Sequence, residues 1–312
     1  MAKLFRVAFS PARLYFHLPV RFSFWSGQSF MSIAPKRSRV VFQELEQDLV
    51  KLSSKPRAEN VHRFRTATRR LQILLGELSP KLDRNQRKLL KLLGRIRKRA
   101  GKLRDLDVQL TALRTLKMPR QPRRKTQLVN HLIELRRQQE KKLRKAVEGD
   151  TVREIRKRLK RAGKSFNPEA SQDPWAVAKG MLERIHHGDA PVTEGLLHQY
   201  RILSKRARYA AEFAEPSAET GHFLAGLKRL QDVLGDWHDW LTLTETASAH
   251  LGDVRESPVV AELHNVTGAK FRHAVAVLSQ MRGAGGPAKP SATAQIPTHG
   301  ASSKSRPSTS AA

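Results

Sequence analysis

Between residues 44 and 281, apolar side chains recur at steps of three and four, and this spacing is the feature that most restricts the fold. It places side chains on one face of a helix rather than on one face of a strand. In residues 61–78 the apolar positions are Val61, Phe64, Leu71, Leu75 and Leu78, and a single threonine, Thr68, continues the same stripe. The same period continues through residues 89–116, 128–147 and 259–281, and no run of five alternating β-branched residues occurs between residues 44 and 281. The sequence therefore predicts an all-α fold.

Helix-breaking residues divide this pattern into separate helices. The breaks stand at Pro56, Ser79-Pro80, Pro119, Pro122 and Gly149-Asp150. Thr193 is predicted to cap the helix that follows it, because its hydroxyl can accept a hydrogen bond from a free backbone N–H. A polar linker, residues 163–175, divides the folded region 41–282 into a first helical unit, 41–162, and a second, 176–282. Long helices joined by short loops pack as antiparallel bundles, so we expect one bundle in each unit.

Two segments of the first unit recur in the second. VHRFRTATRRLQI (residues 61–73) aligns with LHQYRILSKRARY (197–209) at an offset of 136. AGKLRDLDV (100–108) aligns with LGDWHDWLT (234–242) at an offset of 134. Two separate matches at nearly the same offset indicate an internal duplication. Such a duplication predicts two similar bundles related by a pseudo-twofold axis.

Each copy of the first segment carries a stripe of cations that begins with a histidine. In the first copy, His62, Arg65 and Arg69 are spaced i, i+3 and i+7, so they share one helix face. Like charges at this spacing repel one another, and building the stripe twice favours an anionic ligand over a solvated helix face. The candidate binding residues are His62, Arg65, Arg69, Arg70, Lys98, Arg104, His198, Arg201, Lys205, Arg206 and Arg208.

The charge of the whole chain agrees with an anionic partner. Its 312 residues contain 59 Lys and Arg against 28 Asp and Glu, a formal net charge of +31. A field of this sign attracts polyphosphates, nucleic acids or anionic membrane surfaces. The chain has no cysteine, which excludes disulfides, thiol catalysis and cysteine-based zinc sites. No apolar run is long enough to predict a transmembrane helix.

The repeated motifs resemble one known family. They read H-x-x-R-x-x-x-R-R from His62, G-x-x-R-D-L-D-V from Gly101 and L-H-x-x-R-x-x-x-K-R-x-R-Y from Leu197. This pattern is similar to the CHAD domain, the conserved-histidine α-helical domain, over most of residues 44–282. The resemblance implies two four-helix bundles with a basic cleft between them, non-catalytic binding of inorganic polyphosphate, and a cytoplasmic location, in some members on polyphosphate granules. The second unit departs from the pattern, since Lys228 and Arg229 are its only basic residues between positions 220 and 240.

Other functions are less well supported by the residues. Nucleic acid stays open as a competing polyanion, although aromatic residues make up only 6% and lie mostly outside the basic stripes. The surrounding cations oppose a metal site, and no cofactor motif, phosphate loop or nucleophile elbow occurs, so we expect neither metal nor cofactor and no enzyme activity. Asp105, Asp107 and Asp239, close after Gly101 and Gly235, are expected to cap helices or to pair with the basic stripe.

Both ends differ in composition from the region between them. Residues 1–40 contain no acidic residue and form a basic leader. This leader is either a disordered or membrane-touching arm, or an upstream extension before a true start at Met31. Residues 283–312 are rich in Ala, Ser, Pro and Gly, with almost no large apolar side chain, and are predicted to be disordered.

Overall fold

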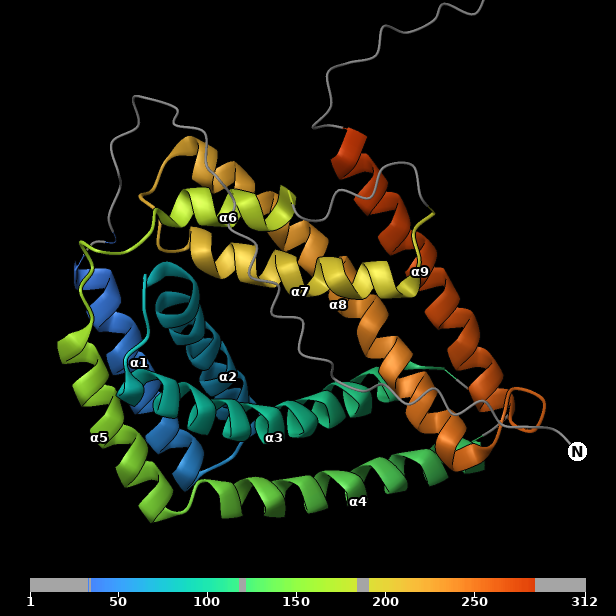
Figure 1. Cartoon of the computed structure of the whole chain (residues 1–312). Coiled ribbons are helices and arrows are strands. Elements are labelled where there is room, and N and C mark those ends of the chain that lie inside the picture. Colours follow the sequence, from blue (N-terminus) through green and yellow to red (C-terminus); the bar gives the residue numbers. More distant parts are fainter. Residues whose placement is uncertain (1–32, 34, 118–121, 184–190, 284–312) are drawn as a thin grey trace, which may run out of the picture.

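The computed structural model describes residues 33, 35–117, 122–183 and 191–283, and these contain helices and no strand (Figure 1). The predicted all-α class is thereby confirmed. Most of the predicted leader and all of the tail from residue 284 onward lie outside the described residues. Residues 35–40, which we had assigned to the leader, form the start of the first helix.

The described part of the chain contains nine α-helices and one short π-helical turn. They are α1 (Pro35–Ser54), α2 (Ala58–Ile73), η1 (Leu74–Leu78), α3 (Arg84–Thr115), α4 (Pro122–Ala146), α5 (Gly149–Ser165), α6 (Pro174–Glu183), α7 (Glu194–Ala211), α8 (Ala218–Leu251) and α9 (Pro258–Gly283). None of these helices is long and apolar enough to cross a membrane.

Local signals explain where several helices begin. The predicted cap at Thr193 is confirmed, since its hydroxyl accepts a hydrogen bond from the backbone N–H of Leu196 at 3.2 Å. A reciprocal pair of hydrogen bonds between Ser217 and Thr220 starts α8 in the same way. Pro122, which we expected in a loop, is instead the first residue of α4. Proline is well tolerated there because the first N–H groups of a helix have no partner within it.

Of the two roles expected for the three aspartates, helix capping is wrong, whereas pairing with the basic stripe is confirmed for Asp105, whose Oδ1 lies 3.6 Å from Nη1 of Arg65. Asp105 and Asp107 lie inside α3, which is 32 residues long, and Asp239 lies inside α8, which is 34 residues long. The neighbouring Gly101 and Gly235 are also helical, so neither glycine ends a helix. Glycine costs only about 1 kcal/mol relative to alanine within a helix, and the apolar period on either side outweighs it here.

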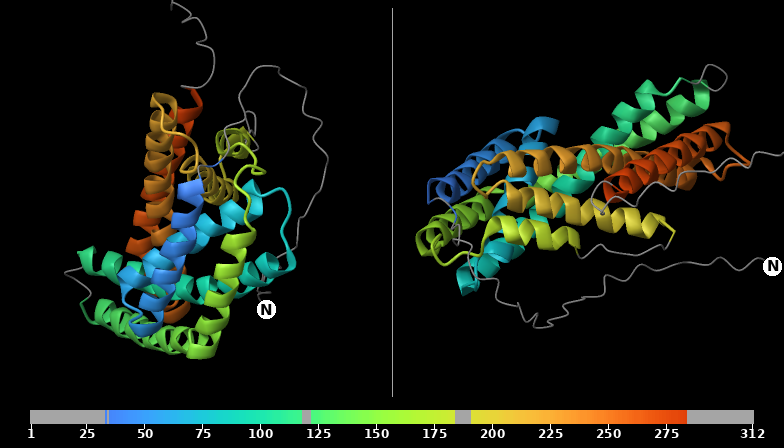
Figure 2. Two further views of the ribbon diagram at one scale, coloured as in Figure 1. Left: turned by 90° about the vertical axis from the view of Figure 1, so that its left-hand side faces the viewer. Right: turned by 90° about the horizontal axis from the view of Figure 1, so that it is seen from above.

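Three hydrophobic cores hold the helices together. The first joins α1, α2, α5 and the first half of α3 with side chains of α6, α7 and α8. The second joins the ends of α3 and α8 with α4 and α9, and the third joins α7, α8 and α9. Figure 2 shows α8 and α9 running side by side along much of their length. The long helices α3 and α8 therefore each pass from one core to another.

The repeated segments lie where these cores meet. α2 packs against α7, and α3 packs against α8 (Figure 1). In α3, Leu103 belongs to the first core and Leu106 to the second, so residues 100–108 span the change. In α8, Trp237 belongs to the third core and Leu243 to the second. In both helices the repeated segment therefore lies between two apolar cores, where polar side chains can be placed.

The capping box at the start of α3 carries a stability prediction. Asp83 Oδ1 accepts a hydrogen bond from the Gln86 N–H at 2.7 Å, and Gln86 Oε1 accepts one from the Asp83 N–H at 3.0 Å. We expect Asp83→Ala to lower the free energy of unfolding by about 1–2 kcal/mol, measured by urea denaturation. The control is Asp150→Ala, which removes an exposed carboxylate from the first turn of α5 and should change stability by less than about 0.5 kcal/mol. Equal effects of the two substitutions would contradict the role of the cap.

Candidate functional site

Charged side chains from four helices meet where α2 and α3 contact α7 and α8. We call this set the cationic cluster. It comprises Arg65 and Arg69 of α2, Arg97 and Arg104 of α3, and Arg201 and Lys205 of α7, together with His62, His198, His238, Asp105 and Asp239. The residues come from both repeats and are close enough to alter one another's pKa. Arg69, for example, acts on both Arg201 and Lys205 across the contact between α2 and α7.

The cations of the cluster are largely removed from water. The Arg65 side chain is only 20% exposed, and burial lowers its pKa from the ordinary value. Burial also lowers the pKa of Arg97 and of Arg201. The effect is largest at Lys205, where burial, followed by the charges of Arg201 and Arg69, lowers the pKa to about 7. Confining like charges in a region of low dielectric destabilises the charged form of each.

The fold does not neutralise these charges. Six cationic side chains share the cluster with two carboxylates, which leaves four positive charges uncompensated when all six are protonated. Asp105 lies 3.6 Å from Arg65, and burial raises the pKa of Asp239 even though Arg201 and Lys205 are nearby. The Nε atoms of Arg97 and Arg201 are buried and make no hydrogen bond among the described residues. Buried donors without acceptors are costly, and an anionic oxygen would satisfy them.

The pKa of each histidine of the cluster is lowered while the cluster is empty. Burial lowers the pKa of His62 and of His198, and neighbouring arginines add to the effect. Burial and the charge of Arg201 lower the pKa of His238 further, to about 3. The His198 and His238 rings lie 5.6 Å apart, and Nδ1 of His238 is buried without a hydrogen-bond partner among the described residues. A nearby anion would favour the protonated form of each ring.

The predicted binding residues do not all point to the same place. His62, Arg65, Arg69, Arg104, His198, Arg201 and Lys205 belong to the cluster. Arg70 instead donates to Glu212 at 2.8 Å and lies 3.7 Å from Glu44. Arg206 is ion-paired with Glu77. Lys98 is exposed and takes no part in the cluster.

Arg208 belongs to the same group as Arg70. Its Nε donates to Glu212 at 3.2 Å, and its Nη1 donates to Gln231 at 3.2 Å. The geometry of a helix explains the division for Arg70 and Arg206. Each follows a cluster residue by one position, which turns its side chain about 100° away around the helix. These arginines therefore stabilise contacts between helices, with carboxylates of the fold itself as partners.

Two members of the cluster, Arg97 and His238, were not among the binding residues predicted from the sequence, although the sequence held a signal for each. Arg97 lies four residues before Gly101 and seven residues before Arg104, so the three residues share one face of α3. This spacing could have identified Arg97, rather than Lys98, as the binding residue. His238 aligns with Arg104 at the offset of 134, and Asp239 aligns in the same way with Asp105. The second repeat thus supplies a histidine where the first supplies an arginine, which accounts for part of the unequal charge of the two units.

The carboxylates and histidines of the described residues do not form a recognisable metal site. No group of three or more His, Asp or Glu side chains is arranged there to hold a metal ion.

Trp237, close to the cluster, is 1% exposed and packs against Phe271 with the rings 6.2 Å apart. Trp237 therefore contributes to packing.

Comparison with known proteins identifies the family of the chain and a similar fold. Residues 41–248 match the family model of the CHAD domain. The fold is similar to the crystal structure of the CHAD domain from the plant Ricinus communis, with a TM-score of 0.57 and 16% sequence identity. That similarity covers 85% of this chain and 97% of the plant domain. No curated protein matches the chain. Since the family model spans more than half of its residues, the protein belongs to the CHAD domain family.

Proposed function

We propose that this protein binds inorganic polyphosphate in the cationic cluster and does not transform it. The observation that carries the proposal is the buried, uncompensated charge, including the unpaired Nε–H groups of Arg97 and Arg201. A folded protein retains such charges at a cost in stability, and a bound polyanion would offset that cost. Membership of the CHAD family supports the choice of ligand.

The residue types suit a flexible chain of phosphates. A guanidinium group can donate to two phosphate oxygens through its planar fork, while the Lys205 ammonium acts as a mobile point charge. The cations come from α2 and α3 on one side and α7 on the other. In this proposal the two units arose by duplication, and their matched helices form the walls of a basic cleft along which the polymer lies.

Nucleic acid is the main competing ligand because it presents the same backbone charge. Proteins that bind single strands usually place exposed aromatic rings beside the cations, so that bases can stack. Trp237, adjacent to His238 of the cluster, is buried in the third core and not accessible to a base. Trp237 therefore offers a base no stacking surface beside the cluster.

A competition experiment separates the two ligands. Labelled long-chain polyphosphate bound to the full-length protein at physiological salt would be challenged with DNA, RNA and heparin at equal anionic charge. We expect unlabelled polyphosphate to displace the label at concentrations at least about tenfold below those needed for DNA or RNA, since duplex and single-stranded backbones can fill the cluster only partly. Displacement by DNA or RNA at equal concentration would overturn the assignment. Shortening of the polyphosphate during incubation with magnesium, resolved on a gel, would overturn its non-catalytic part.

A further inference from the structure

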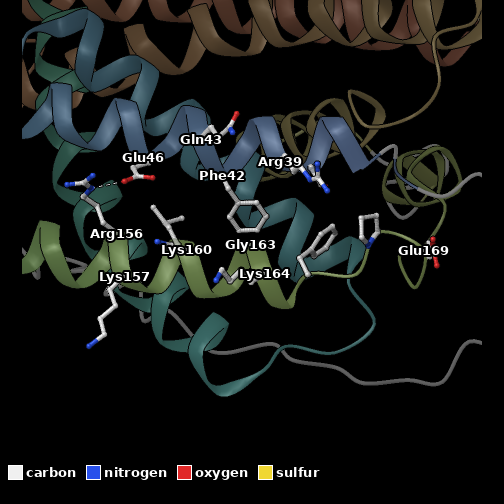
Figure 3. A pocket seen from close by; sticks show the side chains of 14 residues that line it. Arg39, Phe42, Gln43, Glu46, Arg156, Lys157, Lys160, Gly163, Lys164 and Glu169 are labelled. Atoms are coloured by element: carbon white, nitrogen blue, oxygen red, sulfur yellow. Dashed lines mark hydrogen bonds and ion pairs between the residues drawn. The ribbon is translucent and has the colours of Figure 1, made fainter.

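A groove of about 960 Å³ lies between α1 and α5 and shares no lining residue with the cationic cluster (Figure 3). Its floor is apolar and includes two aromatic rings, those of Phe42 and Phe166, whose centroids are 6.2 Å apart. Phe42 projects from α1 toward Gly163 of α5 (Figure 3). A Cβ atom at Gly163 would lie 3.5 Å from the Phe42 ring, so the glycine lets α5 pack closely against this partly buried ring.

The walls of the groove are basic. Arg39 of α1 and Lys160 and Lys164 of α5 line it, and none of the three forms an ion pair or hydrogen bond with the described residues. Lys160 and Lys164 are one helical turn apart, about 6 Å along the axis, and can act on neighbouring anionic groups. Arg156, farther along α5, is instead neutralised by Glu46, which accepts its Nε–H at 2.7 Å. Lys157 and the carboxylate of Glu169 also line the groove, so its five cations outnumber its two carboxylates and leave a net charge of +3.

We propose that this groove binds a nucleoside polyphosphate, with its base against Phe42 and Phe166 and its phosphates at Arg39, Lys160 and Lys164. The groove combines the partly exposed Phe42 ring, backed by the buried Phe166, with unpaired cations, and a nucleotide is a ligand that uses both. Inorganic polyphosphate would leave the rings without a partner, and an apolar ligand would leave the cations without one. The volume of the groove is within the range of small-molecule sites, about 300–1,000 Å³. Stacking on an aromatic face is available to every base, so the groove should accept several nucleotides.

The test compares ATP with tripolyphosphate, which carries the phosphates without the nucleoside. Both would be titrated calorimetrically, without divalent ions, into full-length protein carrying Arg65→Met and Arg201→Met, so that binding in the cationic cluster is suppressed. We expect ATP to bind about tenfold more tightly than tripolyphosphate, the contribution of one stacked base. Phe42→Leu should remove this difference and leave the affinity for tripolyphosphate unchanged. Gly163→Val, which covers the ring without removing it, should have the same effect.

A matched pair of double variants tests the phosphate contacts. Lys160→Ala with Lys164→Ala should weaken the binding of both ligands. Arg153→Ala with Arg161→Ala makes the same change of charge on the same helix and should leave both affinities within about twofold of the parent. Both side chains are exposed and neither lines the groove.

Two results would overturn the nucleotide site. In the first, ATP and tripolyphosphate bind equally well and neither responds to Phe42→Leu or Gly163→Val, which makes the groove a simple basic patch. In the second, ATP does not bind when the cluster is suppressed. Neither result bears on polyphosphate binding in the cluster, which is measured separately with the unmodified cluster and long-chain ligand. Thermal unfolding of each variant shows that the α1–α5 contact is intact.

Discussion

Replacing Arg65 and Arg201 together by methionine should weaken polyphosphate binding by at least about 100-fold, because each arginine loses hydrogen bonds to charged oxygens worth about 1.5–3 kcal/mol. The two residues are equivalent members of the repeats and face each other across the contact between α2 and α7. The slope of log affinity against log salt concentration should also decrease by about two, because two fewer phosphates are neutralised. Fluorescence titrations at several salt concentrations measure both quantities.

The same double variant should not lose stability when the ligand is absent. Methionine keeps most of the apolar stem of arginine and removes a buried charge that the fold leaves largely uncompensated. A loss of binding accompanied by unchanged or higher resistance to urea distinguishes a ligand site from a structural one. The control is Lys141→Met with Lys145→Met, which removes two exposed cations from α4. If the control weakens binding as strongly as the cluster variant, general charge rather than the cluster determines affinity.

Polyphosphate affinity should fall by up to about tenfold for each pH unit between pH 7 and pH 9. Burial and the charges of Arg201 and Arg69 lower the pKa of Lys205 to about 7 in the empty protein. A bound polyanion raises that pKa again, so above pH 7 binding requires the uptake of up to one proton, and one proton corresponds to tenfold per unit. Lys205→Arg should make the profile flat in this window, because a guanidinium stays charged throughout. A wild-type profile that is already flat from pH 7 to pH 9 would contradict the role of Lys205.

The histidines should act on the acidic side of the same profile. Burial lowers the pKa of His62 and of His198 in the empty cluster, and a polyanion favours their charged forms. Affinity should therefore rise further as pH falls below 7, and His62→Gln with His198→Gln should remove that rise alone. Lys205→Arg thus tests the pH dependence of affinity above pH 7, and the double histidine variant tests it below pH 7. The histidine contribution was expected from the sequence, whereas the contribution of Lys205 follows from its burial.

The pKa of Lys205 also determines how the empty protein responds to pH. In the unfolded chain the lysine has its ordinary pKa of 10.5, so between pH 7 and about pH 10 the unfolded state binds more protons than the folded state. Stability without ligand should therefore increase with pH across this window, while affinity for polyphosphate decreases. The opposite signs arise from one cause, since the charged form of Lys205 is unfavourable until an anion is bound.

The sequence by itself determined the helical class, the cap at Thr193 and the two histidine-led stripes. Each depends on residues only a few positions apart, whose relation is set by the rise and turn of a helix. The repeat also gave the equivalence of Asp105 and Asp239, without their roles. The start of α1 at Pro35 was missed because the preceding acid-free segment resembles a leader more than a helix.

Only the tertiary structure decided which cations share one site. Arg69 and Arg70 are neighbours in sequence, yet the first joins the cluster and the second pairs with Glu212, 142 residues away. That division depends on where α7 lies against α2, and no local pattern contains this information. The lowered pKa of Lys205 has the same origin. Its two causes, desolvation and repulsion by other cations, arise only when separate helices pack around the side chain. Residue spacing placed the cations on helix faces, and the packing of α2 and α3 against α7 and α8 brought those faces together.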